Sequence, residues 1–567
     1  MRYRSGRSRR GTGEWLNASA MDARRVWFET ALFVGLTVLV RLPELRQDPH
    51  IDEFFHILAA RSWLAEGELR IADGIYDRGA LYTMLLGWWF GLFGDGLTSA
   101  RLPSVIAGSL WVAAVFLWTR RAAGAGAAWA AGALFALAPG AIWLSQFTRF
   151  YAVHGLLFWL GAVGVYRLFS RPLRPIDLAV IPGVALCFGI ALHLQLITVI
   201  GLLGLGLWVA GVVCMAWLRA DLPRRTRTLG VIAAAALAIV GAAVLLRTGL
   251  AVKLWETYRD VTYWNAEVQA YEAYYFNLFL AQYPTLWPFL PVAVLVAVAS
   301  RPRPALFAAT VFGTAFLLHS FAGNKLERYI YYAMPFLFVL WGIALAQVLP
   351  AASRWLLAVT DRGLAALHLD KPEWLRRSAR WGVPAAAAAF LVVANPAFTQ
   401  TAESLLNPRE PVRTRAWNAA RERLGPLLDR VDVLVTTDEL RSLYYLGRSD
   451  ILLNRIRLME TPKPAEFKDD PRTGRPIIAE FASFARVLDC YPSGLFITEE
   501  RYWGSAEHGG PEAAALLTER ADPIPLPESV NPPGPYRLRI YRWDRMGPVD
   551  PARCASLPNL TAAAEER

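Results

Sequence analysis

The chain has 567 residues, of which 55% are hydrophobic and 19% are charged, and its formal net charge is +12. A soluble domain of this size does not need so many apolar residues, so much of the chain is expected to face lipid. The basic residues cluster in short stretches between apolar blocks, which indicates membrane topology and excludes a nucleic-acid-binding surface.

Eleven apolar blocks approach the ~20 residues that an α-helix needs to cross a bilayer. They predict an α-helical polytopic membrane protein with spans at residues 26–43, 100–119, 126–144, 152–169, 176–193, 195–217, 228–247, 284–300, 304–321, 329–349 and 380–397. Residues 1–25 form a basic N-terminus. The span-length run after them ends in no cleavage site, so we expect it to be retained.

Basic connections predict the orientation. With a cytoplasmic N-terminus, every second connection should be basic. Five connections fit, with Arg120 and Arg121; Arg167, Arg171 and Arg174; Arg219, Arg224, Arg225 and Arg227; Arg301 and Arg303; and Arg376, Arg377 and Arg380. The C-terminal part is then exterior. The Arg- and Ala-rich composition favours a bacterial inner (plasma) membrane, with a periplasmic or otherwise extracellular exterior side.

Residues 80–94 are apolar but too short to cross the membrane. A span here would turn the later basic connections outward, so we expect a helix at the outer interface, where Trp88 and Trp89 are favoured. Residues 44–99 then form an exterior loop of the transmembrane domain, which covers residues 26–397.

Residues 398–567 are predicted to be a small soluble α/β domain on the exterior side. A helical pattern at Arg415–Leu424 and the strand-like runs VDVLVTT, GLFITEE and YRLRIYRW support this prediction. Cys490 and Cys554 could form a disulfide in an oxidising compartment. The sequence alone favours two unpaired cysteines.

The first exterior loop begins DPHIDEFFHILAARSW, which reads as a helix with Asp52 and Glu53 in its first turn. Acids are favoured there by the helix dipole alone. Partial burial beside the membrane and beside Phe54 and Phe55 would instead prepare a carboxylate for base chemistry. His56 would share the helical face of Asp52.

Several cations accompany these acids at the exterior membrane level, where a positive-inside protein should not favour them. Each alone could be a snorkelling anchor. Together they suggest an anionic ligand, for which phosphate at the interface is the natural candidate. They are Arg78, Arg101, Arg149, Lys325 and Arg328.

Four segments in order resemble the GT-C superfamily of lipid-linked-sugar glycosyltransferases, in the branch of protein O-mannosyltransferases and lipid A aminoarabinose transferases. They are IDEFFHILAARSWLAEGEL, DRGALYTMLLGWWFGLFG, SARLPSVIAG and NKLERYIYYAMP, within residues 25–350. The resemblance implies Asp52 as catalytic base, Glu53 assisting, and Arg78, Lys325 and Arg328 on the donor phosphate. Arg149 is a further donor-phosphate candidate, and other site candidates are His56, Arg101, Tyr151, Glu327 and Tyr329.

The turn SQFTRFY departs from the family, because Tyr151 stands where some relatives have an aspartate that contributes to the site or to a metal. We therefore expect metal-independent transfer, with a divalent metal as the open alternative. Asp52, Glu53 and His56 remain as nearby ligands.

The resemblance implies inverting transfer of a hexosyl or pentosyl group from a polyprenyl-phosphate sugar to a hydroxyl or phosphate of a lipid, glycan or protein acceptor. Alternatives are an O-antigen-type ligase or polymerase and a lipid or glycan transporter (flippase). A ligase typically has its large exterior loop late in the chain. A transporter would require polar groups and broken helices at mid-membrane depth.

Overall fold

The computed structural model describes residues 12–171, 174–220, 246–259, 271–367, 373–459 and 467–544, with scattered residues of 223–243 and 554–558. The chain divides into two compact units. We call them the membrane unit, which is residues 1–43, 104–146 and 150–407, and the α/β unit, which is residues 44–103, 147–149 and 408–567. Each unit therefore contains segments that lie far apart in the sequence.

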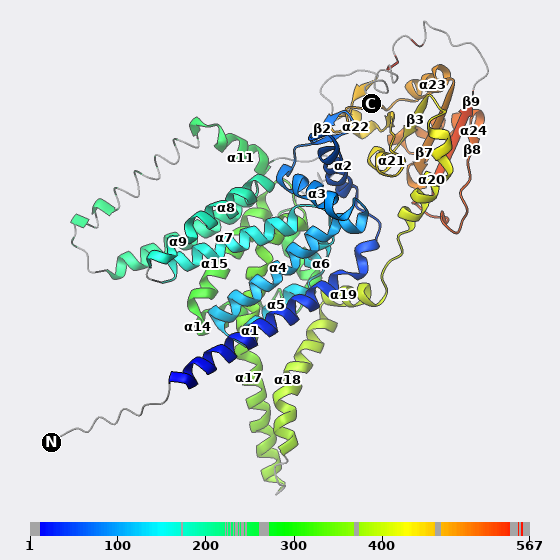
Figure 1. The fold of residues 1–567 in the computed structure, drawn as a ribbon. Coiled ribbons are helices and arrows are strands. Elements are labelled where there is room, and N and C mark those ends of the chain that lie inside the picture. Colours follow the sequence, from blue (N-terminus) through cyan, green and yellow to red (C-terminus); the bar gives the residue numbers. More distant parts are fainter. Residues whose placement is uncertain are drawn as a thin grey trace, which may run out of the picture. The chain divides into compact units, whose positions relative to one another are not determined.

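The membrane unit is helical (Figure 1). Its helices are α1 (Thr12–Arg41), α4 (Leu97–Ala123, from Ser104 on), α5 (Ala125–Leu137), α6 (Pro139–Ser145), α7 (Tyr151–Phe169), α8 (Val180–Leu194), α9 (Thr198–Arg219), α11 (Leu250–Arg259), α13 (Tyr274–Gln282), α14 (Leu290–Ser300), α15 (Pro302–Phe321), α16 (Glu327–Ile330), α17 (Met334–Ala366), α18 (Glu373–Ala394) and α19 (Pro396–Leu406). In the described residues, six helices are long and apolar enough to cross a membrane, or eight if two bent pairs are each counted as one. The chain is thus a multi-pass membrane protein.

Two of the eleven expected spans are broken. The 126–144 span becomes α5 and α6, bent by 63°, and the 380–397 span breaks between α18 and α19, bent by 87°. In both cases the second helix begins with a proline, Pro139 or Pro396, which lacks an N–H and disfavours helix in the residue before it. The 284–300 span is helical only from Leu290, and much of 228–247 lies outside the described residues.

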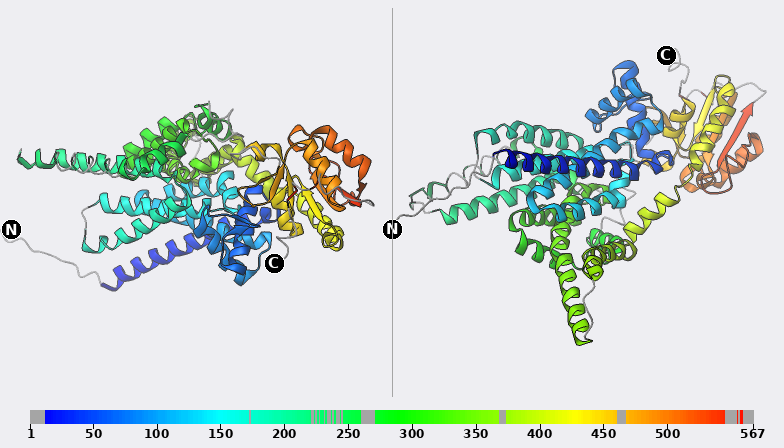
Figure 2. Two further views of the ribbon diagram at one scale, coloured as in Figure 1. Left: turned by 90° about the horizontal axis from the view of Figure 1, so that it is seen from above. Right: turned by 60° about the horizontal axis from the view of Figure 1, so that its bottom comes forward.

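Helix α17 is the packing centre of the membrane unit. It contacts α5, α14 and α15, and α18 lies beside its far half, where the pair extends beyond the other helices of this unit (Figures 1 and 2). Gly342 permits the close approach of α5, because a Cβ there would lie 2.5 Å from the Ala127 carbonyl oxygen. Small residues at such crossings let helix backbones pack closely within a membrane. The helix continues to Ala366, well past the expected span end at residue 349.

The α/β unit is built on a seven-stranded sheet with the order β5-β6-β4-β3-β7-β9-β8. Strands β6, β4, β3 and β7 are parallel, and β5, β9 and β8 are antiparallel to their neighbours. The strands are β3 (Val433–Thr436), β4 (Ile451–Leu453), β5 (Lys468–Asp469), β6 (Pro476–Ile478), β7 (Ser493–Glu499), β8 (Asp522–Pro523) and β9 (Leu538–Asp544). The three expected strand runs are confirmed as β3, β7 and β9.

Helices cover both faces of this sheet. They are α20 (Val412–Leu428), α21 (Glu439–Leu446), α22 (Arg455–Met459), α23 (Phe481–Cys490) and α24 (Gly510–Arg520). Side chains alternate along each strand, so Leu495 and Ile497 join one hydrophobic core and Phe496 joins the other. The expected helix at 415–424 is confirmed within α20.

The segment after the first span belongs to this same unit. It contains α2 (Ile51–Glu66), a hairpin of β1 (Arg70–Ile71) and β2 (Gly74–Ile75), and α3 (Ala80–Phe93). Phe54 and Phe55 of α2 lie in one hydrophobic core with Trp417 of α20 and Leu434 of β3. The acid-bearing helix is therefore packed on the sheet of the C-terminal domain, to which its phenylalanines anchor it.

Cys490 and Cys554 form a disulfide, so the expectation of two unpaired cysteines is wrong. The sequence separation of 64 residues gave no indication of the pairing, whereas the fold brings their Cα atoms to 5.6 Å. That separation is typical of disulfides. Structural disulfides persist in oxidising compartments.

Candidate functional site

The site begins at the first turn of α2, which is held by a reciprocal cap. His50 precedes the helix, and its Nδ1 accepts a hydrogen bond from the Asp52 backbone N–H at 3.1 Å. The Glu53 carboxylate in turn accepts from the His50 backbone N–H at 3.0 Å. Such a capping box satisfies N–H groups that a helix start leaves unpaired. The cap therefore fixes the positions of Asp52 and Glu53 through hydrogen bonds to a residue that is adjacent in the sequence.

Glu53 is buried and fully engaged. The Arg101 guanidinium donates two hydrogen bonds to its carboxylate, at 2.9 and 2.7 Å, and the Thr148 backbone N–H donates a third at 2.9 Å. Burial alone would raise the pKa of Glu53, but the Arg101 charge and these hydrogen bonds outweigh it, and the pKa lies below its ordinary value. Arg101 also donates to the carbonyls of Leu45 and Gln47. Through these contacts Arg101 connects the segment of Leu45 and Gln47 to Glu53 at the start of α2.

Asp52 differs from its neighbour, because its side chain keeps 18% of its surface exposed. Its carboxylate forms an ion pair with the guanidinium of Arg149, which is itself almost buried. His50 Nδ1 lies 3.8 Å from the same carboxylate. The pair Asp52 and Arg149 thus combines an accessible carboxylate with a fixed cation, whereas Glu53 is enclosed.

His56 is buried on the same helix, one turn further on. Its Nδ1 lies 2.8 Å from the Thr83 hydroxyl, and its ring meets Tyr76 and Tyr82 edge to face. Burial, followed by the charge of Arg149, lowers the pKa of His56 well below its ordinary value. The imidazole is therefore neutral at neutral pH. This suits a role in packing α2 against α3 rather than one as a charged acid.

Arg78 lies in the loop between β2 and α3 with an exposed side chain. Its charge also lowers the pKa of His56, which places it in the electrostatic neighbourhood of the α2 face. An exposed cation can reach a ligand without breaking an internal contact. Arg78 is therefore better placed to bind a ligand than Arg101, whose guanidinium is held by Glu53.

The remaining candidates lie in the membrane unit, around the turn before α16. Lys325 is buried and donates to the Ala322 carbonyl at 2.8 Å. The Arg328 guanidinium lies 5.8 Å from the ring centre of Tyr151 and 5.7 Å from that of Tyr329. Glu327 begins α16, near Gly140 of α6. The structure thus groups Lys325, Glu327, Arg328, Tyr329 and Tyr151 in one unit, and Asp52, Glu53, His56, Arg78, Arg101 and Arg149 in the other.

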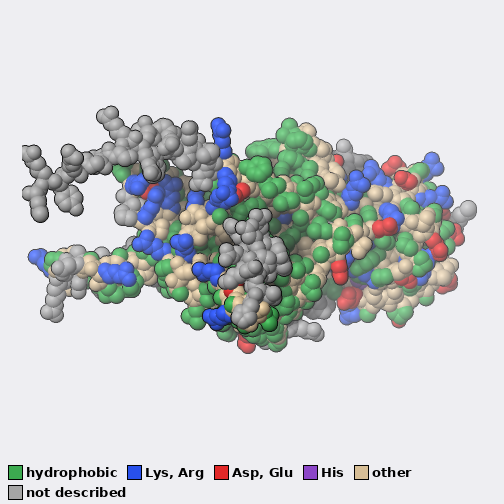
Figure 3. Space-filling view, turned by 90° about the horizontal axis from the view of Figure 1, so that it is seen from below, with side chains coloured by type: hydrophobic (Ala, Val, Ile, Leu, Met, Phe, Trp, Pro, Cys, Tyr) green, Lys and Arg blue, Asp and Glu red, His purple; other side chains and the backbone are tan. Residues whose placement is uncertain are grey.

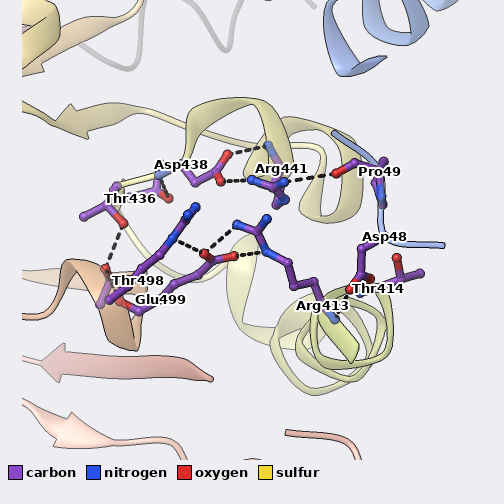
Figure 4. A network of polar contacts seen from close by, with 11 residues as sticks. Asp48, Pro49, Arg413, Thr414, Thr436, Asp438, Arg441, Thr498 and Glu499 are labelled. Atoms are coloured by element: carbon purple, nitrogen blue, oxygen red, sulfur yellow. Dashed lines mark hydrogen bonds and ion pairs between the residues drawn. The ribbon is translucent and has the colours of Figure 1, made fainter. Parts of the chain in front are cut away.

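Sequence reasoning missed the residues that attach the start of α2 to the sheet. Asp48 accepts hydrogen bonds from the backbone N–H groups of Arg413 (3.0 Å) and Thr414 (2.7 Å), as Figure 4 shows. Helix α20 has no side-chain cap of its own, so Asp48 caps it from a residue distant in sequence. Arg441 donates to the Pro49 carbonyl at 3.2 Å and lies over the ring of Phe54. Nothing local in the sequence reveals this partnership.

The same network continues to the carboxyl ends of β3 and β7. The Arg413 guanidinium binds Glu499 through two hydrogen bonds, at 2.8 and 2.6 Å, and Arg441 pairs with Asp438 (Figure 4). Glu499 ends β7 and Asp438 caps α21 after β3. Ion pairs at this sheet edge therefore fix the two arginines that hold residues 48–54.

A carboxylate metal site on Asp52 and Glu53 does not fit the side chains present. Within the described residues, no three His, Cys, Asp or Glu side chains lie close enough to hold a metal ion. Glu53 is occupied by Arg101, and Asp52 faces the Arg149 cation.

Comparison with known proteins identifies the fold. No family model matches the chain, and no curated protein sequence does. The crystal structure of ArnT from Cupriavidus metallidurans bound to undecaprenyl phosphate superposes with a TM-score of 0.58 at 16% identity, covering 90% of this chain and 97% of that one. Archaeal oligosaccharyltransferase AglB from Archaeoglobus fulgidus, in complex with an inhibitory peptide and a dolichol-phosphate, superposes with a TM-score of 0.52 at 12% identity, covering 88% and 73%.

The chain therefore shares its fold with ArnT and AglB and has a small C-terminal sheet. At these identities the likeness concerns the fold alone.

Proposed function

We propose that this GT-C-fold membrane protein is a glycosyltransferase that moves a hexosyl or pentosyl group from a polyprenyl-phosphate donor at the outer membrane face. Two observations support the donor class: the superposed ArnT structure holds undecaprenyl phosphate, and the AglB structure holds a dolichol-phosphate. The observation that carries the assignment of chemistry is the contrast between enclosed Glu53 and accessible Asp52 on one rigid helical turn.

In this mechanism Asp52 is the base. The acceptor hydroxyl oxygen attacks the anomeric carbon, its proton passes to the Asp52 carboxylate, and the bond from the anomeric carbon to the phosphate oxygen breaks. The electron pair of that bond leaves with the polyprenyl phosphate. A single displacement inverts the anomeric centre. General base catalysis of this kind contributes about 10²–10⁴-fold in rate.

Arg149 is proposed to interact first with the Asp52 carboxylate and then with the donor phosphate. Its guanidinium pairs with the Asp52 carboxylate before reaction and offers hydrogen bonds that match a phosphate. Arg78, Lys325 and Arg328 are proposed to contact the donor phosphate on the strength of the sequence motifs. Glu53 and Arg101 are proposed to position Asp52, because their side chains are consumed by each other and by the loop.

The deciding experiment is Asp52→Asn in the purified full-length protein, supplied with a polyprenyl-phosphate sugar. Transfer should fall by about 10²–10⁴-fold while the thermal unfolding midpoint stays within a degree or two of wild type. Substitution of the exposed Asp429, at the far end of α20, is the matched control and should leave transfer unchanged. Full transfer by Asp52→Asn would refute the assignment.

Metal-independent transfer is a separate proposal. It is supported by the occupied state of Glu53 and by Tyr151 at the position where some relatives carry an aspartate. Treatment with a chelator should leave the rate unchanged. If the chelator abolished transfer and a divalent ion restored it, this proposal would be overturned, whereas the proposed role of Asp52 would be unaffected.

A lipid transporter is the second candidate, because the two bent helix pairs resemble the broken helices of transporters. Transfer assayed in detergent separates the two functions, since detergent leaves no sealed compartment. A transporter would show no product there, and would move lipid in vesicles whether or not Asp52 is replaced.

A further inference from the structure

Five arginines from three separate connections line one hollow in the membrane unit. The hollow has a volume of about 810 Å³ and lies between the ends of α4, α7 and α14 and the start of α15. The arginines are Arg121, Arg167, Arg171, Arg301 and Arg303. Figure 3 shows Lys and Arg side chains gathered at one end of the membrane unit, with hydrophobic side chains over its middle.

Two of these arginines are fixed by a buried carboxylate. Asp177 Oδ1 accepts hydrogen bonds from Arg167 at 2.9 Å and from Arg171 at 2.7 Å. Arg303 donates to the Ser170 carbonyl at 3.3 Å, which joins the start of α15 to the end of α7. The wall of the hollow is therefore organised by specific contacts and is more than a set of solvated loops.

The charge at the hollow is poorly balanced. Asp177 is shared by two arginines, while Arg121 and Arg301 form no ion pair in the part of the chain that the structure describes. Like charges held this close repel one another, so a bound anion would stabilise the arrangement. Guanidinium groups match phosphate oxygens in geometry as well as in charge.

The position of the hollow at the ends of the apolar helices indicates a lipid as the source of the phosphate. It lies where the apolar stretches of α4, α7 and α15 end, and its lining includes Trp118 and Tyr166, which pack edge to face. Aromatic side chains of this kind mark the headgroup level of a bilayer. The volume falls in the range of about 300–1,000 Å³ that small-molecule sites occupy, so it admits a headgroup larger than one phosphate ion.

We propose that this hollow binds the headgroup of an anionic phospholipid, with the arginines on its phosphodiester groups and Trp118 and Tyr166 beside its glycerol. A headgroup with two phosphates, as in diphosphatidylglycerol, fits the excess charge best. The positive-inside rule accounts for basic turns but not for their convergence on one hollow. The proposal is independent of the transfer reaction.

The test variant is Arg121→Gln with Arg301→Gln, because neither side chain forms a hydrogen bond or ion pair within the described residues whose loss would disturb folding. The control is Arg354→Gln with Arg362→Gln, which removes the same charge from exposed arginines of α17 outside the hollow. The full-length protein is purified, titrated with diphosphatidylglycerol, phosphatidylcholine or sodium phosphate, and followed by native mass spectrometry and thermal unfolding.

Wild type and control should bind diphosphatidylglycerol tightly and unfold at a higher temperature with it, while phosphatidylcholine and sodium phosphate have little effect. The test variant should bind that lipid about 30-fold more weakly, as expected for the loss of two charges beside a headgroup. Equal binding by test and control variants would overturn the proposal. Equal protection by sodium phosphate would overturn the lipid source.

Discussion

Arginines of the α/β unit face carboxylates, whereas those at the basic end of the membrane unit converge on one another. Arg101 meets Glu53, Arg149 meets Asp52 and Arg413 meets Glu499, each within hydrogen-bonding reach. Around the hollow, Arg167 and Arg171 share Asp177, while Arg121 and Arg301 form no ion pair within the described residues. An arginine paired with a carboxylate holds the local geometry, because removing either partner leaves a buried ion without compensation. An unmatched charge is available to a ligand.

The largest effect should follow from breaking a matched buried pair. Glu53→Gln leaves the Arg101 charge without compensation in a buried site, and should cost about 3–5 kcal/mol of stability. Thermal unfolding of the purified protein measures this loss. Glu410→Gln, which removes the partner of Arg415 on the surface, is the control and should cost at most about 1 kcal/mol. Equal losses would contradict the distinction.

A smaller effect should appear on changing pH, at a histidine near matched arginines. Burial, and next the charge of Arg501, lower the pKa of His508 to about 4. The unfolded chain therefore binds a proton at higher pH than the folded one, so stability falls between about pH 6.5 and pH 4, by up to about 3 kcal/mol. Unfolding midpoints from pH 7 to pH 4 should decline less in His508→Gln. Parallel curves would exclude His508 as the source.

Arg149 sharpens the comparison, since it is matched by a carboxylate and is also proposed to bind phosphate. Arg149→Gln removes hydrogen bonds from a charged donor, which are worth about 1.5–3 kcal/mol, and transfer should fall by about 10–100-fold. The apparent donor affinity should weaken while acceptor affinity is retained. An unchanged donor affinity would show that Arg149 serves Asp52 alone.

The smallest effect concerns the cap between distant segments. Asp48→Ala removes the carboxylate from the start of α20 and should cost about 1 kcal/mol of stability. The turnover rate should fall more than donor affinity does, because Asp48 holds the chain just before α2. Asp48→Asn should restore part of both. A stability loss with unchanged turnover would confine Asp48 to a structural role.

Much of the architecture followed from patterns that are local in the chain. Apolar length predicted the membrane helices, alternation predicted β3, β7 and β9, and the order of the motifs predicted a fold that the chain shares with ArnT. The breaks at Pro139 and Pro396 could also have been foreseen, since proline cannot continue a helix without losing a hydrogen bond.

The sequence by itself determined which segments are apolar, basic or strand-like, and that Asp52 and Glu53 share a first helical turn. The tertiary structure alone decided that Phe54 and Phe55 enter the core of a domain that begins about 350 residues later, that Arg101 consumes Glu53, and that Cys490 meets Cys554. The physical reason is that spacing fixes the face a side chain shares, while burial, ion pairing and cross-linking depend on which distant segment packs against that face.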